Sequence, residues 1–301
     1  MSALLWLMVG ALAVTTACSR QDTGKVRVDA ELAKLVPAGT LHLIGGDFRA
    51  IRETTTYEKL IARRGIPPLE NFARQTGLDP RTDLDEFLIA STGEGAVLLA
   101  RGRFQREKLE RKLTDVGAKS FTHQSQRLLG NEEAVASFPK DGVAVGGTQA
   151  AVKAALEGAA VSSGLAEPLV QQIKRITERP HLWAVTAGGL PPLELPQTGM
   201  LGNLHKIYAS LETAVFWVDL ESGVKLRAAG SCTSEEAAKQ VRGGLKALIG
   251  LGRLSTPQDR AELLRFYDGV EVLQEGAEVR FHADFPLELV EQVIAMFPSR
   301  R

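Results

Sequence analysis

The sequence FLIASTGEGAVLLARGRF, residues 87–104, decides the expected fold, because it returns in altered form as VFWVDLESGVKLRAAGSC, residues 215–232. Each copy has two apolar runs around a glycine-containing turn, which is the pattern of a β-hairpin. The copies align without gaps, so that Gly95 stands opposite Gly223 and Gly102 opposite Gly230. A repeated hairpin predicts that the chain contains two related antiparallel units.

Two shorter matches support a duplication. The segment GIPPLE, residues 65–70, corresponds to GLPPLE, residues 189–194, and the pair His42-Leu43 corresponds to His181-Leu182. The three matches follow one another in the same order as the elements around them, although their offsets differ. We attribute the offsets mainly to a helix at residues 54–64 that the second copy lacks.

The periodicity of the remaining sequence alternates between helix and strand. We expect strands at residues 40–45, 87–92, 96–102, 119–124, 133–138, 143–146, 181–186, 206–211, 214–220, 224–230, 270–274 and 278–283. Helical spacing occurs at residues 31–35, 54–64, 69–76 and 148–156, and around Leu109, Leu169, Val241 and Leu289. Thr233 and Glu236 have the spacing of a capping box, which predicts a helix start.

These elements predict an α+β fold of two tandem related lobes, each an antiparallel sheet packed against helices. We place the first lobe at residues 30–157 and the second at residues 165–298. The segment GAAVSSG, residues 158–164, has neither helical nor strand periodicity and is rich in small residues, so we interpret it as the linker.

The N-terminus has the features of an export signal that ends in a lipidation site. Every residue from Ala3 to Ala17 is apolar, Gly or Thr, small residues precede Cys18, and the sequence then becomes polar. This pattern resembles a bacterial lipobox, which implies removal of residues 1–17, acylation of Cys18 and a flexible tether over residues 18–29. The alternative is an uncleaved membrane anchor, because Thr15 stands where lipoboxes usually have Leu.

The composition limits the classes of partner. The chain has 36 basic and 36 acidic side chains, and the leader contains none of them. Without a basic excess, nucleic acid is not an expected partner. Cys232 is the only thiol besides Cys18, so no internal disulfide is expected, and we interpret Cys232 as a small apolar residue at a strand end.

One motif resembles a known group of proteins. The segment TGLDPRTDL, residues 76–84, precedes the strand-like FLIA, residues 87–90. A Gly-Leu-Asp turn and a second Asp before a strand resemble uncharacterised two-lobed bacterial envelope proteins. The resemblance implies fold and location only, because it carries no established activity.

We predict no catalytic, metal or cofactor site. The carboxylates Asp79, Asp83, Asp85 and Glu86 lack the alternate spacing and central Gly of a calcium loop, so we assign them to helix capping and turns. The five histidines lack metal-ligand spacing, and no Gly-x-Ser-x-Gly or Ser-x-x-Lys motif is present.

The Pro- and Leu-rich segment from Leu190 to Leu201 is unusual for a surface loop. Its large apolar side chains at Leu193, Leu195, Met200 and Leu201 would form an exposed patch unless something covers them. Either the loop packs on its own domain or between the lobes, or it forms one wall of an apolar groove or a partner contact.

These observations lead to one functional expectation and two alternatives. We expect a non-enzymatic, membrane-anchored lipoprotein of the bacterial cell envelope with a binding or scaffolding role. Ser19, next to Cys18, is compatible with sorting to an outer membrane. Its partners would be the membrane, through the lipid anchor, and an envelope protein or an apolar ligand. The alternatives are an envelope hydrolase with a site at the lobe interface and a carrier of lipid or another apolar ligand.

Overall fold

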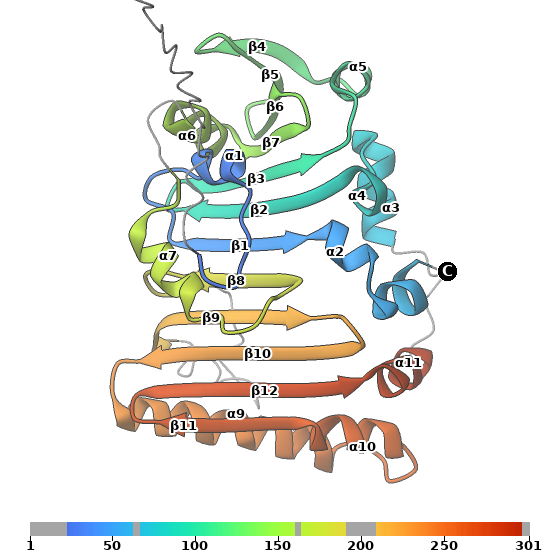
Figure 1. The fold of residues 1–301 in the computed structure, drawn as a ribbon, viewed down its shortest axis with the longest axis vertical. Coiled ribbons are helices and arrows are strands. Elements are labelled where there is room, and N and C mark those ends of the chain that lie inside the picture. Colours follow the sequence, from blue (N-terminus) through green and yellow to red (C-terminus); the bar gives the residue numbers. More distant parts are fainter. Residues whose placement is uncertain (1–22, 63–66, 160–163, 191–208, 297–301) are drawn as a thin grey trace, which may run out of the picture.

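A single antiparallel sheet runs through the whole molecule. The computed structural model describes residues 23–62, 67–159, 164–190 and 209–296. Its sheet has twelve strands in the order β11-β12-β10-β9-β8-β1-β2-β3-β7-β6-β5-β4, and helices lie on both faces (Figure 1). The mixture of helix and antiparallel sheet confirms the predicted α+β class.

The bounds of the elements are as follows. The strands are β1 (His42–Asp47), β2 (Leu84–Thr92), β3 (Gly95–Gly102), β4 (Lys119–His123), β5 (Gln126–Gly130), β6 (Ala134–Lys140), β7 (Val143–Thr148), β8 (Leu182–Thr186), β9 (Leu211–Asp219), β10 (Gly223–Cys232), β11 (Val270–Glu275) and β12 (Glu278–Pro286). The helices are α1 (Ala30–Lys34), α2 (Phe48–Arg52), the π-helix η1 (Tyr57–Ile61), α3 (Pro67–Thr76), α4 (Pro80–Asp83), α5 (Arg106–Asp115), α6 (Gln149–Ala159), α7 (Glu167–Lys174), α9 (Glu235–Leu254), α10 (Ala261–Asp268) and α11 (Leu287–Met296).

Part of the strand order repeats on either side of the neighbouring strands β1 and β8. From β1 outward the order is β2, β3, β7, β6, β5 and β4, and from β8 outward it is β9, β10, β12 and β11. Each half has a helix before its first strand, a helix after its third strand and a helix after β7 or β12. The halves therefore share these elements, whereas β4 and β5 have no counterpart among the described residues of the second half. The spatial superposition of residues 30–157 on 165–298 stays a prediction.

The arrangement in two lobes with separate sheets is not confirmed. Strand β1 pairs with β8 in an antiparallel register that sets Leu43 opposite Val185. Both side chains are buried, and both belong to one hydrophobic core that also contains Trp183. The pairing satisfies the backbone groups of both strands, so the halves meet within the sheet rather than at an interface between two sheets.

The repeated hairpins use glycine for the same reason. Gly95 and Gly223 each begin the second strand of their hairpin, with φ angles of +144° and +147°. A Cβ atom would lie 2.3 Å from Thr148 Oγ1 at Gly95 and 2.5 Å from the carbonyl oxygen of Phe285 at Gly223. Both the backbone conformation and the space thus require glycine.

The two faces of the sheet carry different cores. On β3, Val97 and Leu99 point into the large core that α6 and α7 cover, and Leu98 and Ala100 point to the opposite face. That opposite face packs against α5 in the first half, and against α9, α10 and α11 in the second. In Figure 1, α7 lies in front of the sheet and α9 behind it.

The helix expected at residues 54–64 is found over residues 55–61, and its last five residues form the π-helix η1. At its start, the hydroxyl of Thr54 donates to the carbonyl oxygen of Ile51 at 2.8 Å and accepts from the N–H of Tyr57 at 3.0 Å. The hydroxyl of Thr56 bonds both the carbonyl and the N–H of Gly223, at 3.0 and 2.8 Å. The bonds of Thr56 tie this helix to the second hairpin.

Three other expectations need correction. Helix α9 begins with Ser234, whose side chain accepts from Ala237 N–H, and not with a capping box at Thr233. Strand β5 was not predicted.

Residues 23–29 of the predicted tether are packed, because Val26 is buried in the large core and Asp29 caps α1. Cys232 is confirmed as a buried residue at a strand end.

Every described element and core cluster lies between residues 23 and 296. A protein that begins at Ser19 therefore keeps all of them. Within the described ranges, the helices are all too short or too polar to span a membrane.

Candidate functional site

The Gly-Leu-Asp motif forms a tight connection between α3 and β2. Gly77 has a φ angle of +76° and donates its N–H to the carbonyl oxygen of Ala73 at 2.8 Å, which ends α3. The change of direction turns Leu78 into the core beneath α5, where it is buried with Leu84 and Leu109. The motif therefore places two apolar side chains on one wall of the first half.

The carboxylates of the motif hold this connection in place. Asp79 caps α4 by accepting from the N–H of Arg81 at 2.9 Å, and its carboxylate also binds the Arg81 guanidinium at 2.8 Å. Asp83 accepts from the N–H of Asp79 at 2.8 Å. The hydrogen bonds from Arg81 lower the pKa of Asp79 below its usual value, so this carboxylate is charged over most of the pH range.

The other two carboxylates of the group serve different contacts. Asp85 pairs with Arg52 at 2.9 Å. Burial raises the pKa of Glu86, and the nearby carboxylates Asp47 and Asp29 raise it further. The group therefore acts as caps and ion pairs, as the sequence predicted for Asp79, and its members do not converge on a common point.

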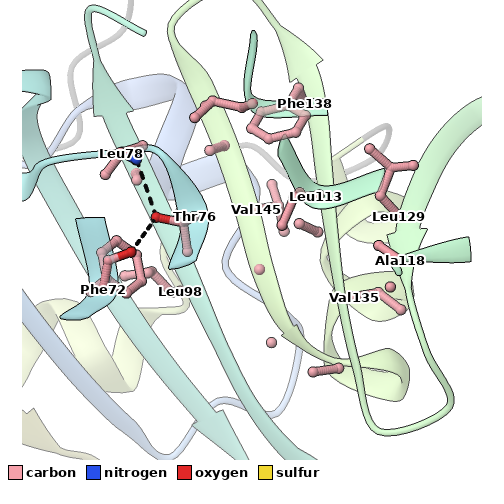
Figure 2. A pocket seen from close by; sticks show the side chains of 18 of the residues that line it. Phe72, Thr76, Leu78, Leu98, Leu113, Ala118, Leu129, Val135, Phe138 and Val145 are labelled. Carbon is pink, nitrogen blue, oxygen red and sulfur yellow. Dashed lines mark hydrogen bonds between the residues drawn. The ribbon is translucent and has the colours of Figure 1, made fainter. Parts of the chain in front are cut away.

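An apolar pocket of about 360 Å³ lies behind this connection (Figure 2). It is bounded by α3, α5, the segment that leads to β2 and the strands β3, β5, β6 and β7. The lining residues are Phe72, Thr76, Leu78, Leu84, Leu98, Ala100, Leu109, Leu113, Ala118, Leu129, Gly130, Ala134, Val135, Ala136, Phe138, Ala144, Val145, Gly146 and Gly147. This volume falls within the range of small-molecule sites.

The pocket is hollow because its floor consists of small residues. Ala100, Ala136, Ala144 and Gly146 point to the same side of neighbouring strands, as the registers of β3, β6 and β7 show. None of these residues has a side chain beyond Cβ. Helix α5 supplies Leu109 and Leu113 from above, and these two side chains leave the space over the small residues unfilled.

Among the described residues, the lining offers no free polar side chain. The one polar side chain among them is that of Thr76, whose hydroxyl donates to the carbonyl oxygen of Phe72 at 2.8 Å and accepts from the N–H of Leu78 at 3.2 Å (Figure 2). Apolar cavities of this kind stay dry and bind apolar molecules. The lining residues also supply no acid, base or nucleophile pair for catalysis.

The pocket can be reached from the surface beside α3 and α5. Phe72, Leu113 and Ala118 are only partly buried, whereas Leu109, Leu129 and Phe138 are buried at the inner wall. A ligand that enters past the partly exposed residues meets increasingly buried apolar side chains. This arrangement removes apolar ligand surface from water without requiring a polar group to lose its hydration.

The pocket is not one of the sites that the sequence suggested. Cys18 and the loop residues Leu193, Leu195, Met200 and Leu201 all lie outside the described residues. A signal for the pocket was nevertheless present in the sequence. Alanine and glycine recur at alternate positions in β6 and β7, at Ala134 and Ala136 and at Ala144 and Gly146, where a filled core would need larger side chains.

Comparisons with known proteins provide no family for this chain. No protein-family model and no curated protein matches it. Among solved structures, crystal form I of TP0453 gives a TM-score of 0.48 at 11% identity, over 89% of this chain and 97% of that chain. Crystal form III of TP0453 gives 0.46 at 10% identity, over 90% of this chain and 99% of that chain. At these scores the likeness assigns no function to this chain.

Proposed function

We propose that this chain is a lipid-anchored, non-enzymatic binding protein of the bacterial cell envelope, and that its ligand is an apolar molecule held in the pocket. The pocket is the observation that supports this proposal. About 360 Å³ of space is lined by apolar side chains and one internally satisfied threonine. The lining atoms lack partners on the hollow side, and an apolar ligand would supply those contacts.

The N-terminus supports the location. An apolar leader followed by Cys18 would anchor the protein to a membrane, and several acyl chains hold it stably because each buried methylene contributes about 0.8 kcal/mol. Since residues 23–29 are packed on the domain, only residues 19–22 would separate the anchor from the fold. The pocket would then stay close to a bilayer, which is a source of apolar ligands.

Native mass spectrometry tests the ligand. We expect the protein, purified without detergent as the chain from Ser19, to carry an apolar molecule that denaturation releases. Ala100→Leu should abolish this adduct, because the larger side chain occupies the pocket floor, which is otherwise formed by small residues. Ala283→Leu is the matched control, since Ala283 is a buried strand residue in the second half and lies outside the pocket.

The adduct should therefore disappear in one variant and persist in the other. An adduct of equal abundance in both variants would place the ligand elsewhere, and no adduct after incubation of the parent with an extract of envelope lipids would remove the proposed function.

Metabolic labelling tests the anchor separately. Cells that express the full chain and grow with an alkyne fatty acid should yield a labelled protein on a denaturing gel, where non-covalent ligand is lost. Cys18→Ala should abolish the label, and Cys232→Ala should keep it, because Cys232 is buried. Label that survives Cys18→Ala would remove the lipoprotein assignment.

A further inference from the structure

The apolar surface of the pocket continues across the middle of the sheet. Leu98 lines the pocket on β3 and pairs with Ile89 on β2, which pairs with Ile44 on β1. Ile44 pairs with Ala184 on β8, and Ala184 with Phe216 on β9. Directly opposed residues of neighbouring strands point to the same face with Cβ atoms about 5 Å apart. We call the row Leu98, Ile89, Ile44, Ala184 and Phe216 the apolar strip.

The strip is accessible at its middle residue and at the end that is farther from the pocket. Ile44 is 42% exposed and Phe216 is 38% exposed, although both stand on central strands of the sheet. The strip begins at Leu98, which lines the pocket, and ends at Phe216. Phe216 pairs with Ala228 on β10, and Ala228 pairs with Phe281 on β12, which packs in the core beneath α9. An accessible apolar row that begins inside a pocket extends the binding surface beyond that pocket.

The strip has a polar row on one side and an apolar row on the other. Two positions along the strands on the same face, the neighbours of Ile89, Ile44 and Ala184 are Ser91, His42 and Thr186, which are polar. On the other side the neighbours are Phe87, Gly46 and Leu182, and the side chains of Phe87 and Leu182 both approach Gly46. An acyl chain that lies along the strip, away from the polar row, would therefore contact only apolar groups.

We infer that the ligand is an amphiphile with one long acyl chain, part of which lies in the pocket and part along the apolar strip. This inference rests on the proposed function and specifies its ligand. Four strand spacings of about 4.8 Å separate Leu98 from Phe216, so the strip is about 19 Å long. One leaflet of a bilayer, half of a hydrocarbon core of about 30 Å, is about 15 Å thick. The strip can thus accommodate the length of a membrane acyl chain.

The length of the acyl chain decides whether a ligand contacts the strip as well as the pocket. The pocket alone can hold a short acyl chain, whereas a long acyl chain also contacts Ile44 and the residues beyond it. We would titrate the chain from Ser19, freed of bound lipid, with decanoic acid and with palmitic acid in a calorimeter. Palmitic acid should bind at least tenfold more tightly than decanoic acid, because more apolar surface leaves water.

Ile44→Asn tests the strip directly. We expect it to weaken palmitic acid binding roughly tenfold, since an amide would lie under the acyl chain without a partner, and to leave decanoic acid binding unchanged. Leu273→Asn is the matched control, because Leu273 is an apolar strand residue with 40% exposure on the opposite face. It should change neither affinity. Phe216→Asn provides a second, independent variant at the far end of the strip.

The other outcomes overturn the inference in distinguishable ways. Palmitic acid affinity that survives both Ile44→Asn and Phe216→Asn but is lost in Ala100→Leu would refute the strip and leave the pocket as the site. Failure of both acids to bind the parent would refute the acyl ligand, and the native mass spectrum would then show whether the pocket has another ligand. A lower melting temperature of ligand-free Ile44→Asn relative to Leu273→Asn, or a loss of dimers, would mean that another part of the chain or a second copy covers the strip.

Discussion

Apart from β4 and β5, the described strands of the two halves of the sheet follow the same order, and the last helix of each half lies on an opposite face. In the first half, α6 follows β7 and buries Val152 and Ala155 in the large core. In the second half, α11 follows β12 and buries Leu289 beside Phe285, on the face that α9 covers. The strands are thus repeated, whereas the helix layers are not.

This difference explains why one half is hollow and the other is filled. The second half has α9, α10 and α11 on one face, where Phe266 and Phe285 stack with ring centroids 3.8 Å apart. The first half has α3 and the shorter α5 on the corresponding face, because α6 lies on the other side. A duplicated sheet can therefore keep one half as a stable core while the other half retains space for a ligand.

The opposite face of the second half shows the other consequence. No helix of the described residues takes the place of α6 here, and the row of Trp217, Arg227 and His282 lines a polar recess. Arg227 binds Asp284, and Arg175 binds Glu278 at 2.6 Å. Ion pairs replace the apolar layer that covers this face in the first half.

The largest expected effect comes from truncating matched aromatic residues in the two halves. Phe285 and Phe138 are buried to a similar degree, with 4% and 6% exposure, but Phe138 borders the pocket and Phe285 is stacked on Phe266. Phe285→Ala should lower the free energy of unfolding by about 3–5 kcal/mol. Phe138→Ala should cost less, since a side chain beside a void has fewer contacts to lose. Urea unfolding of both variants measures this, and equal losses would mean that the pocket is not hollow in solution.

The next effect concerns the opposite substitution, from small to large. Ala100→Leu should raise the free energy of unfolding of the ligand-free protein by about 1–2 kcal/mol, because the added methylenes occupy the pocket floor. Ala283→Leu should lower it by about 1–3 kcal/mol, because Ala283 stands in a filled core. Thermal melts of both variants measure whether each substitution stabilises or destabilises the protein. Destabilisation by both substitutions would contradict the contrast between the halves.

The smallest effect is the pH dependence of the connection at Asp79. The pKa of Asp79 is lowered in the folded protein, so its charge stabilises the fold above the unfolded pKa of about 3.9, and this contribution is lost as the pH falls through the folded pKa. Asn keeps the capping oxygen and removes the charge. Asp79→Asn should therefore be less stable than the parent at neutral pH, and the difference should shrink as the pH falls. A difference that is constant with pH would contradict this role of the charge.

Much of the fold could be predicted from local patterns. The repeated hairpin predicted β2 with β3 and β9 with β10, because the positions of Gly95 and Gly223 specify the turn. The joining of both halves in one sheet could not be predicted, since it depends on the pairing of His42–Asp47 with Leu182–Thr186, about 140 residues away. Sequence patterns describe each strand but not its distant partner.

The pocket escaped prediction for a related reason. Alternating alanine and glycine in β6 and β7 also suits a close helix, and only the short α5 and the position of α6 leave the space empty. The buried bonds of Thr56 to Gly223 show the same limit, because they connect residues 167 positions apart and local spacing does not predict them. A void forms where no helix side chain packs over the small strand residues, and the sequence of the strands alone does not show which helices will pack there.

The helix layer of the first half is hollow and apolar, whereas that of the second half is filled. The most direct measurement is a crystal structure of the delipidated chain from Ser19 under xenon pressure, because xenon enters dry apolar cavities. We predict xenon density among Leu98, Leu109 and Leu129, and none between α9 and β10. Ala100→Leu crystals should lose that density. Xenon in both layers, in neither layer, or unchanged in Ala100→Leu would contradict the account.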